Sequence, residues 1–176
     1  MLARAIAFAE TRDAKIAETT FTAGLLHDLG KLVLAGNVPE MYETVQRMRE
    51  SKNISQLEAE RLVLGTTHVE VGACLLATWS LPLPILEAIA CHHAPRQSTE
   101  TGFSLLAAVH VANVLSQENC AGSDGQTADS IDLEFLFRSG LGDCRNRWRE
   151  VCGLPARQES GSLEERLRRR KESKEN

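Results

Sequence analysis

The chain is poor in aromatic residues and contains no long apolar run. Phe, Trp and Tyr make up 5% of its 176 residues, whereas 43% of the residues are hydrophobic. The core must therefore be built mainly from aliphatic side chains, which favours packed helices over a β-sheet. No apolar run approaches the ~18 residues that a membrane-spanning helix requires. We expect an all-α protein that is soluble and cytoplasmic.

The net charge and the cysteine content argue against proteins that bind nucleic acid or membranes and against disulfide-rich secreted proteins. The net charge of −4 provides no general attraction to nucleic acid or to an anionic membrane, so we expect neither as a partner. The five cysteines include no C-x-x-C pair and no secretory signal precedes them, which predicts reduced thiols. Cys74 and Cys91 lie near histidines and are an alternative source of soft-metal ligands, although their small apolar neighbours favour ordinary buried thiols.

The length suits one domain with a hydrophobic core. We predict a helical core over residues 1–119 and a loop with C-terminal helices that complete the core over residues 120–156. Residues 157–176 are expected to form a charged tail, disordered or helical. Within this scheme the Gly- and Ser-rich stretch 118–130 is predicted to be an exposed loop.

Apolar spacing and capping residues predict the helices. We expect an Ala-rich helix over residues 2–9, a second from an N-cap at Thr19 or Thr20 to about Leu34, and a third over residues 39–51. The second helix is expected to face the core through Phe21, Leu25, Leu29, Leu32 and Val33. The later helices are predicted to begin at Ser55, at Thr66 or Thr67, at Pro84, at Phe103, and at Ser130 or Asp132.

A His-Asp pair is the first clue to function. His27 and Asp28 lie in an apolar segment, and Lys31 follows within one helical turn. On an uninterrupted helix these three side chains would occupy adjoining parts of one face. Burying an imidazole, a carboxylate and an ammonium group without a partner would be costly, so we infer that a cation or an anion binds nearby.

The other histidines follow at intervals along predicted helices. His68 lies in a first turn, His92 and His93 at a helix C-terminus, and His110 within a long apolar helix. A single His on an apolar helix is usually a packed, hydrogen-bonded side chain, which is the simpler interpretation of His68 or His110 alone. Gly72, four residues after His68, is expected to leave room above its imidazole. Taken together, the set favours binding of a metal ion or a phosphate.

Three motifs resemble the HDOD domain, the HD-related output domain of bacterial signalling proteins. They are residues 23–32, which contain Gly-Leu-Leu-His-Asp-Leu-Gly-Lys, residues 65–72, and residues 81–95, in which Leu-Pro-Leu-Pro precedes His-His-Ala-Pro. Their order and spacing agree with the family over roughly residues 1–119. The resemblance implies a helical bundle of the HD/HDOD type, related to metal-dependent phosphohydrolases and to the HD-GYP cyclic-dinucleotide phosphodiesterases.

The resemblance also implies a site. In those relatives a metal-bound water attacks phosphorus while the cations neutralise the developing charge. The implied cofactor is a divalent ion (Fe, Mn, Zn or Mg), with a vacant site as the alternative, and Lys31 matches a lysine that contacts substrate phosphate. The implied metal ligands are His27, Asp28, His68, His92 and His93.

Departures from the active relatives weaken the catalytic interpretation. No His precedes His27, where those relatives carry a first ligand, and Asn113 lies where they carry a late ligand Asp. A neutral amide binds hard cations more weakly than a carboxylate does. The Gly-Tyr-Pro signature of HD-GYP enzymes is also missing, since Arg96 follows Pro95. A mononuclear or vacant site is therefore expected rather than a working dinuclear one.

Three functions follow from these observations. The first is a regulatory output module that contacts signalling proteins or upstream receiver or sensor domains. The second is a metal-dependent phosphohydrolase or cyclic-dinucleotide phosphodiesterase, and the third is a sensor that binds a metal or nucleotide without turnover. HDOD domains carry preceding helices, so we also expect the apolar face of residues 2–9 to be covered by a partner or by homo-oligomer formation.

Overall fold

The computed structural model describes residues 1–120 and 130–155. These residues form helices and connecting turns with no strand, which confirms the predicted all-α class. Within the same ranges, no helix combines the length and apolar character needed to cross a membrane. Most of the loop predicted over residues 118–130, and all of the tail predicted over residues 157–176, lie outside the described residues.

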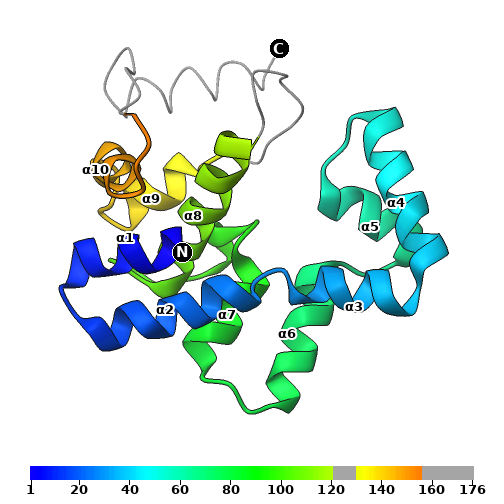
Figure 1. Cartoon of the computed structure of the whole chain (residues 1–176), viewed down its shortest axis with the longest axis horizontal. Helices are drawn as coiled ribbons and strands as arrows, with labels where there is room; N and C mark the ends of the chain where they lie inside the picture. Colours follow the sequence, from blue (N-terminus) through cyan, green and yellow to red (C-terminus); the bar gives the residue numbers. More distant parts are fainter. Residues whose placement is uncertain (121–129, 156–176) are drawn as a thin grey trace.

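The main bundle contains the N-terminal and C-terminal helices (Figure 1). Helices α1 (Leu2–Thr11) and α2 (Ala14–Leu26) pack on each other and on α7 (Leu83–Cys91) and α8 (Leu105–Cys120). The short helices η1 (Pro95–Gln97), α9 (Leu133–Arg138) and α10 (Cys144–Val151) complete it. The core is largely aliphatic, as predicted, and its largest fully buried side chains also include Phe135 and Trp148.

The middle of the chain forms an arm that projects from this bundle (Figure 1). Helix α3 (Leu29–Asn37) leads outward, α4 (Pro39–Lys52) and α5 (Gln56–Leu64) pack on each other, and α6 (His68–Thr78) returns to α7. We refer to residues 39–64 as the α4–α5 hairpin. Among the described residues, the main core cluster includes none from this hairpin. The hairpin is therefore held to the bundle by few apolar contacts.

The second helix begins earlier than predicted. Asp13 is its N-cap, because its carboxylate accepts hydrogen bonds from the N–H groups of Lys15 at 2.7 Å and Ile16 at 3.2 Å. The predicted caps, Thr19 and Thr20, instead lie inside α2, where each hydroxyl donates to a backbone carbonyl four residues earlier. The N-cap prediction was therefore wrong. Asp13 precedes Thr19 and Thr20 in the chain and satisfies free N–H groups at the start of α2.

The second helix also ends earlier than predicted. In an uninterrupted helix the Gly24 carbonyl would accept from the N–H of Asp28. Here the His27 ring bonds to that carbonyl through Nδ1 at 2.8 Å, and Asp28 leaves the helical region with φ −104° and ψ 11°. Helix α3 then starts at Leu29. The prediction that His27, Asp28 and Lys31 share one continuous helical face was wrong, because a turn separates them into two helices.

Two glycines allow α3 and α6 to approach closely. A Cβ on Gly30 would lie 1.9 Å from the carbonyl oxygen of His68, and a Cβ on Gly72 would lie 3.2 Å from the Gly30 nitrogen. Gly72 thus allows a close approach, as predicted, and the group that approaches is the backbone of α3. The turn before α3 also leaves Leu25 and Leu32 68% and 72% exposed, although both were predicted to face the core.

The other predicted starts agree with the structure to within about two residues, the usual uncertainty of helix ends. Ser55 caps α5, and Asp132 caps α9. Thr67 caps α6 and forms a capping box with Glu70, so both orphan donors at this end are satisfied. These caps fix the position at which His68 enters α6.

The Asp13 cap can be tested against the predicted one. We expect Asp13→Ala to lower the free energy of unfolding by about 1 kcal/mol, because two N–H groups of α2 lose their acceptor. Thr19→Ala is the matched control and should change it by less than about 0.5 kcal/mol, since Thr19 is a half-buried interior position of the helix whose hydroxyl bonds to the Lys15 carbonyl at the surface. Urea denaturation followed by circular dichroism measures both. A larger loss for Thr19→Ala than for Asp13→Ala would contradict the assignment.

Candidate metal centre

Four of the predicted ligands come together where helices begin or end. Asp28 lies in the turn between α2 and α3, His68 is the first residue of α6, and His92 and His93 follow α7. One potential ligand atom from each of these four lies within 4.8 Å of all the others. Residues far apart in the sequence thus form one compact group, which we call the Asp28 group.

His92 is oriented by the end of α7. Its Nδ1 bonds to the Ile89 carbonyl at 2.8 Å, as His27 bonds to the Gly24 carbonyl at the end of α2. A carbonyl can only accept, so Nδ1 carries the proton and the lone pair lies on Nε2. The free C-terminal carbonyls of two helices therefore orient both rings so that Nε2 faces Asp28, at 3.7 Å for His92 and 3.4 Å for His27.

His68 is oriented by a carboxylate. Its Nδ1 lies 2.7 Å from Oε2 of Glu60, and its backbone N–H donates to the same oxygen at 2.8 Å. Glu60 and His68 are both completely buried. A carboxylate that accepts from one nitrogen of a ligand His fixes its tautomer and increases its basicity, an arrangement common at protein metal sites. Glu60 was not predicted from the sequence, because nothing in the local pattern of α5 distinguishes it from an exposed helical Glu.

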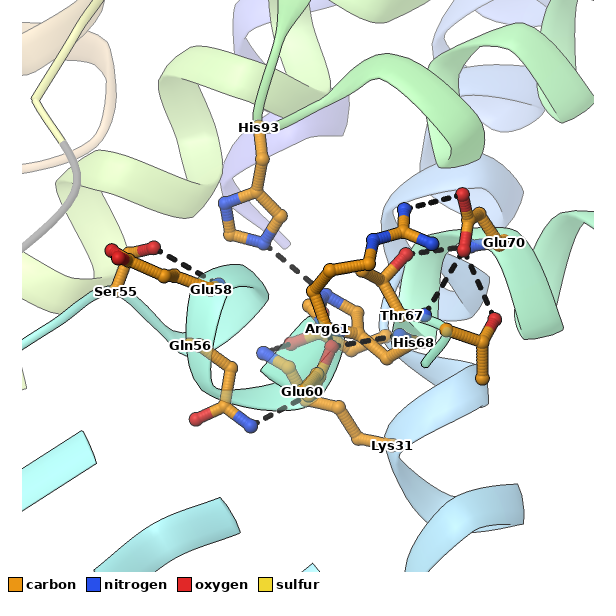
Figure 2. Close-up of polar contacts among 12 residues, drawn as sticks. Lys31, Ser55, Gln56, Glu58, Glu60, Arg61, Thr67, His68, Glu70 and His93 are labelled. Atoms are coloured by element: carbon orange, nitrogen blue, oxygen red, sulfur yellow. Dashed lines mark hydrogen bonds and ion pairs between the residues drawn. The ribbon is translucent and has the colours of Figure 1, made fainter. Parts of the chain in front are cut away.

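His93 approaches His68 directly. The two Nε2 atoms are 3.2 Å apart (Figure 2). Since Nδ1 of His68 donates to Glu60, its Nε2 presents a lone pair, and a second lone pair facing it would be repulsive. A proton or a cation must lie between these two nitrogens, and a metal ion bound by both rings meets this need.

Two buried atoms of the group have unused capacity as acceptors. Among the described residues, Oδ1 of Asp28 and Nε2 of His92 are buried and have no hydrogen-bond partner. They face each other at 3.7 Å, and Oδ1 of Asp28 is 3.4 Å from Nε2 of His68. Buried polar atoms are rarely unsatisfied. Because an oxygen anion and an imidazole lone pair cannot satisfy each other, the residues present fit a cation.

The electrostatic environment favours the metal-binding protonation states. Burial holds the pKa of His92 well below its usual value, with a further contribution from His93 and His27. Burial also lowers the pKa of His68, and its bond to Glu60 offsets only part of this effect. Burial alone would raise the pKa of Asp28, but its electrostatic interactions with His27 and Lys31 and the hydrogen bond from Lys31 outweigh burial, so the pKa is lowered. Neutral imidazoles and an ionised carboxylate are the forms that bind metals.

The donor set indicates which metals fit. Three imidazole nitrogens and one carboxylate oxygen suit borderline divalent ions such as Zn, Fe and Mn better than Mg, which prefers oxygen ligands. Neither of the cysteines considered above belongs to the Asp28 group. Cys74 is exposed, so the expectation of a buried thiol was wrong there, whereas burial raises the pKa of the Cys91 thiol.

His27 and Lys31 lie beside the group rather than in it. Nε2 of His27 and Nζ of Lys31 approach the other carboxylate oxygen of Asp28, at 3.4 Å and 2.7 Å. Both side chains line a cavity of about 330 Å³ that Arg4 and Asn113 also line. Asn113 thus lies near the group, as the resemblance implied. Metal ligation by His27 stays a prediction, as does a phosphate contact by Lys31.

The remaining histidine has a structural role. Nδ1 of His110 bonds to the His92 carbonyl at 2.7 Å, and its Nε2 accepts from the N–H of Asp132 at 2.9 Å. It therefore joins the end of α7 to the start of α9 and supports the position of His92. The interpretation of His110 as a packed, hydrogen-bonded side chain is confirmed.

Comparisons with known proteins agree with this fold and site. The sequence model of the HDOD domain matches residues 1–95, which is more than half of the chain. The chain therefore belongs to the HDOD family, and its fold is the helical bundle of the HD type. This result confirms the family that the three motifs indicated.

Two individual proteins are similar to the chain. A Treponema pallidum (strain Nichols) protein named "Uncharacterized protein" is 30% identical over 104 residues, which cover 59% of this chain and 20% of that protein. This chain thus spans about one fifth of that relative. A crystal structure of a "Putative phosphohydrolase" from Shewanella amazonensis SB2B has a TM-score of 0.61 and 18% identity, covering 86% of this chain and 57% of the other. At this identity the likeness concerns the fold alone.

Proposed function

We propose that this HDOD domain binds one divalent transition-metal ion and acts as a cytoplasmic output module of bacterial signal transduction, through contacts with other proteins. The unsatisfied pair formed by Asp28 and His92 is the observation that supports the metal. His68 and His93 complete a set of four ligands. Four protein ligands around one borderline ion are typical of a structural or regulatory site, whereas catalytic sites usually leave a position open for water.

The composition of the site supports regulation over hydrolysis. Metal-dependent phosphohydrolysis with two ions needs ligands that neutralise and bridge both of them. Among the described residues, the Asp28 group has one carboxylate, and Glu60 is directed toward the far nitrogen of His68. Asn113 contributes an amide to the neighbouring cavity where a second ion would need a charged ligand.

We also propose that the partners of this domain are other domains or a second copy of this chain. Since this chain spans about one fifth of its Treponema relative, the domain would work beside other domains such as receivers or sensors. Most of the apolar face of α1 is buried in the core of this chain, at Ala3, Ile6 and Ala7. The side chain of Phe8, which is 46% exposed, would contact such a domain or a second copy of this chain.

A metal-dependent phosphohydrolase or phosphodiesterase is the second candidate. The cavity beside the Asp28 group supports it, because Arg4 and Lys31 would attract an anion and its volume of about 330 Å³ suits a nucleotide. The charges are partly compensated, however: Arg4 pairs with Glu18 at 2.6 Å and Lys31 pairs with Asp28. A nucleotide ligand without turnover would use the same cavity.

A combined metal and turnover measurement separates the two candidates. We expect protein purified without chelator to contain about one transition-metal ion per chain, as four ligands imply. We also expect no hydrolysis of cyclic dinucleotides or of bis(p-nitrophenyl) phosphate above the metal-only background, even with added Mn or Fe. Turnover that disappears in the His92→Ala protein would reject the regulatory proposal and favour the enzyme.

A further inference from the structure

Glu60 is a buried carboxylate on an otherwise peripheral helix. It is completely buried, while its neighbours along α5, Glu58 and Arg61, are exposed. Its two oxygens accept three hydrogen bonds: from the backbone and ring of His68, and from Nε2 of Gln56 at 2.8 Å. Burying a charge is costly unless it is paired and hydrogen-bonded in this way. Glu60 therefore attaches α5 specifically to the residue that begins α6.

The α4–α5 hairpin has few other buried contacts. Val45 is the buried residue of α4, and Ala59 and Glu60 are the buried residues of α5. Segments with so few buried apolar contacts open locally at low free-energy cost. Beside the exposed ion pair of Arg61 with Glu70, the buried contact between Glu60 and His68 joins the hairpin to α6.

A second side chain of the hairpin lies close to the same charges. Burial raises the pKa of Tyr42 on α4, and the negative charges of Glu60 and Asp28 raise it further. A change of charge at the Asp28 group is therefore expected to act on the hairpin through α4 as well as through Glu60.

We propose that Glu60 is a positioning residue that couples metal binding at the Asp28 group to docking of the α4–α5 hairpin. The inference rests on the proposed metal site. A cation on Nε2 of His68 polarises the ring and makes its Nδ1–H a stronger donor to Glu60. Metal binding therefore tightens the hairpin, and by reciprocity a partner protein that releases the hairpin weakens metal binding. The hairpin is the part of the fold through which the state of the metal site is presented to a partner.

The first test measures metal affinity. We expect Glu60→Gln to weaken Zn or Mn binding by about 10- to 100-fold, the usual effect of removing a charged hydrogen-bond partner of a ligand His. The amide oxygen of the variant can still accept from His68, and the Gln56 amide can turn to accept from the new NH2 group, so the fold should persist. Glu58→Gln removes an exposed charge from the same helix and should leave the affinity unchanged. Competition with a chromophoric chelator measures all three proteins.

The second test measures the hairpin itself. Hydrogen–deuterium exchange of the wild-type protein should slow over residues 56–64 when metal is added. In Glu60→Gln at saturating metal this protection should be lost, while residues of α8 exchange as before. If Glu60→Gln fails to fold, Gln56→Ala serves instead: it leaves the carboxylate in place, removes one of its donors, and should weaken both effects in part.

The outcomes distinguish this inference from the proposed function. If the wild-type protein binds no metal, the metal site and the coupling are both rejected. If the wild-type protein binds metal but Glu60→Gln binds it equally well, or metal leaves exchange over residues 56–64 unchanged, the coupling alone is rejected. Weaker metal binding together with lost protection in Glu60→Gln supports it.

Discussion

The Asp28→Asn protein is expected to fold and to lose its metal ion. The substitution removes the carboxylate of the Asp28 group and replaces it with an amide of the same shape. We expect affinity for Zn or Mn to fall by more than about 100-fold, because loss of a charged ligand should exceed the cost of changing a partner of a ligand. The measurement is the metal-to-protein ratio after dialysis, together with calorimetric titration.

The Asp28→Asn protein is expected to fold because the new amide can satisfy a neighbouring buried atom. The amide of Asn can donate a hydrogen bond to Nε2 of His92, the buried atom that lacks a partner beside Asp28. Thermal stability without metal should therefore be close to that of the wild-type protein. Asp143→Asn, an exposed position at the start of α10, is the matched control and should retain the metal. Full metal content in Asp28→Asn would overturn the assignment of the site.

The Gly30→Ala protein is expected to be severely destabilised. Its Cβ would lie 1.9 Å from the carbonyl oxygen of His68 and 2.9 Å from the backbone nitrogen of Gly72, and neither backbone atom can move without displacing α6. Overpacking a core typically costs about 1–3 kcal/mol. A clash with the backbone of a neighbouring helix should reach or exceed about 3 kcal/mol at the upper end of that range.

A second glycine of α3 provides the control. A Cβ on Gly36 meets nothing within 4 Å, so Gly36→Ala should be neutral or stabilise the protein by up to about 1 kcal/mol through helix propensity. Urea denaturation with circular dichroism compares the two variants. Because α6 carries His68, Gly30→Ala should also weaken metal binding. Equal stability of the two variants would show that α3 and α6 do not pack as closely as described.

Local sequence patterns predicted three later helix starts, each from a single capping residue. Ser55, Thr67 and Asp132 satisfy N–H groups within their own helix, so their effect can be predicted without knowing the fold. The second helix was predicted less well. Its start was placed at Thr19 or Thr20 rather than at Asp13, and its end depends on the His27 ring competing for a backbone carbonyl. Apolar spacing alone cannot show such competition, so the prediction based on it extended the second helix through the turn at Asp28.

The candidate metal site was likewise predicted in part from the sequence, while another part of it is visible only in the structure. The motifs around Asp28, His68 and His92 indicated the family and four of the residues that the structure brings together. Glu60 was not predicted, because its role comes from a contact with His68 across two elements rather than from its own helix. Its burial is a property of how α5 packs, not of the sequence of α5.

The sequence by itself determined the all-α class, the family and the residue types available to bind a metal. These features depend on local spacing and on short motifs, which can be recognised in the sequence without knowing which residues are in contact. Only the tertiary structure decided which atoms converge, that Nε2 of His27, His68 and His92 faces Asp28, and that Glu60 supports His68. Those features depend on distances between residues far apart in the chain, and packing of α2, α3, α6 and α7 sets these distances.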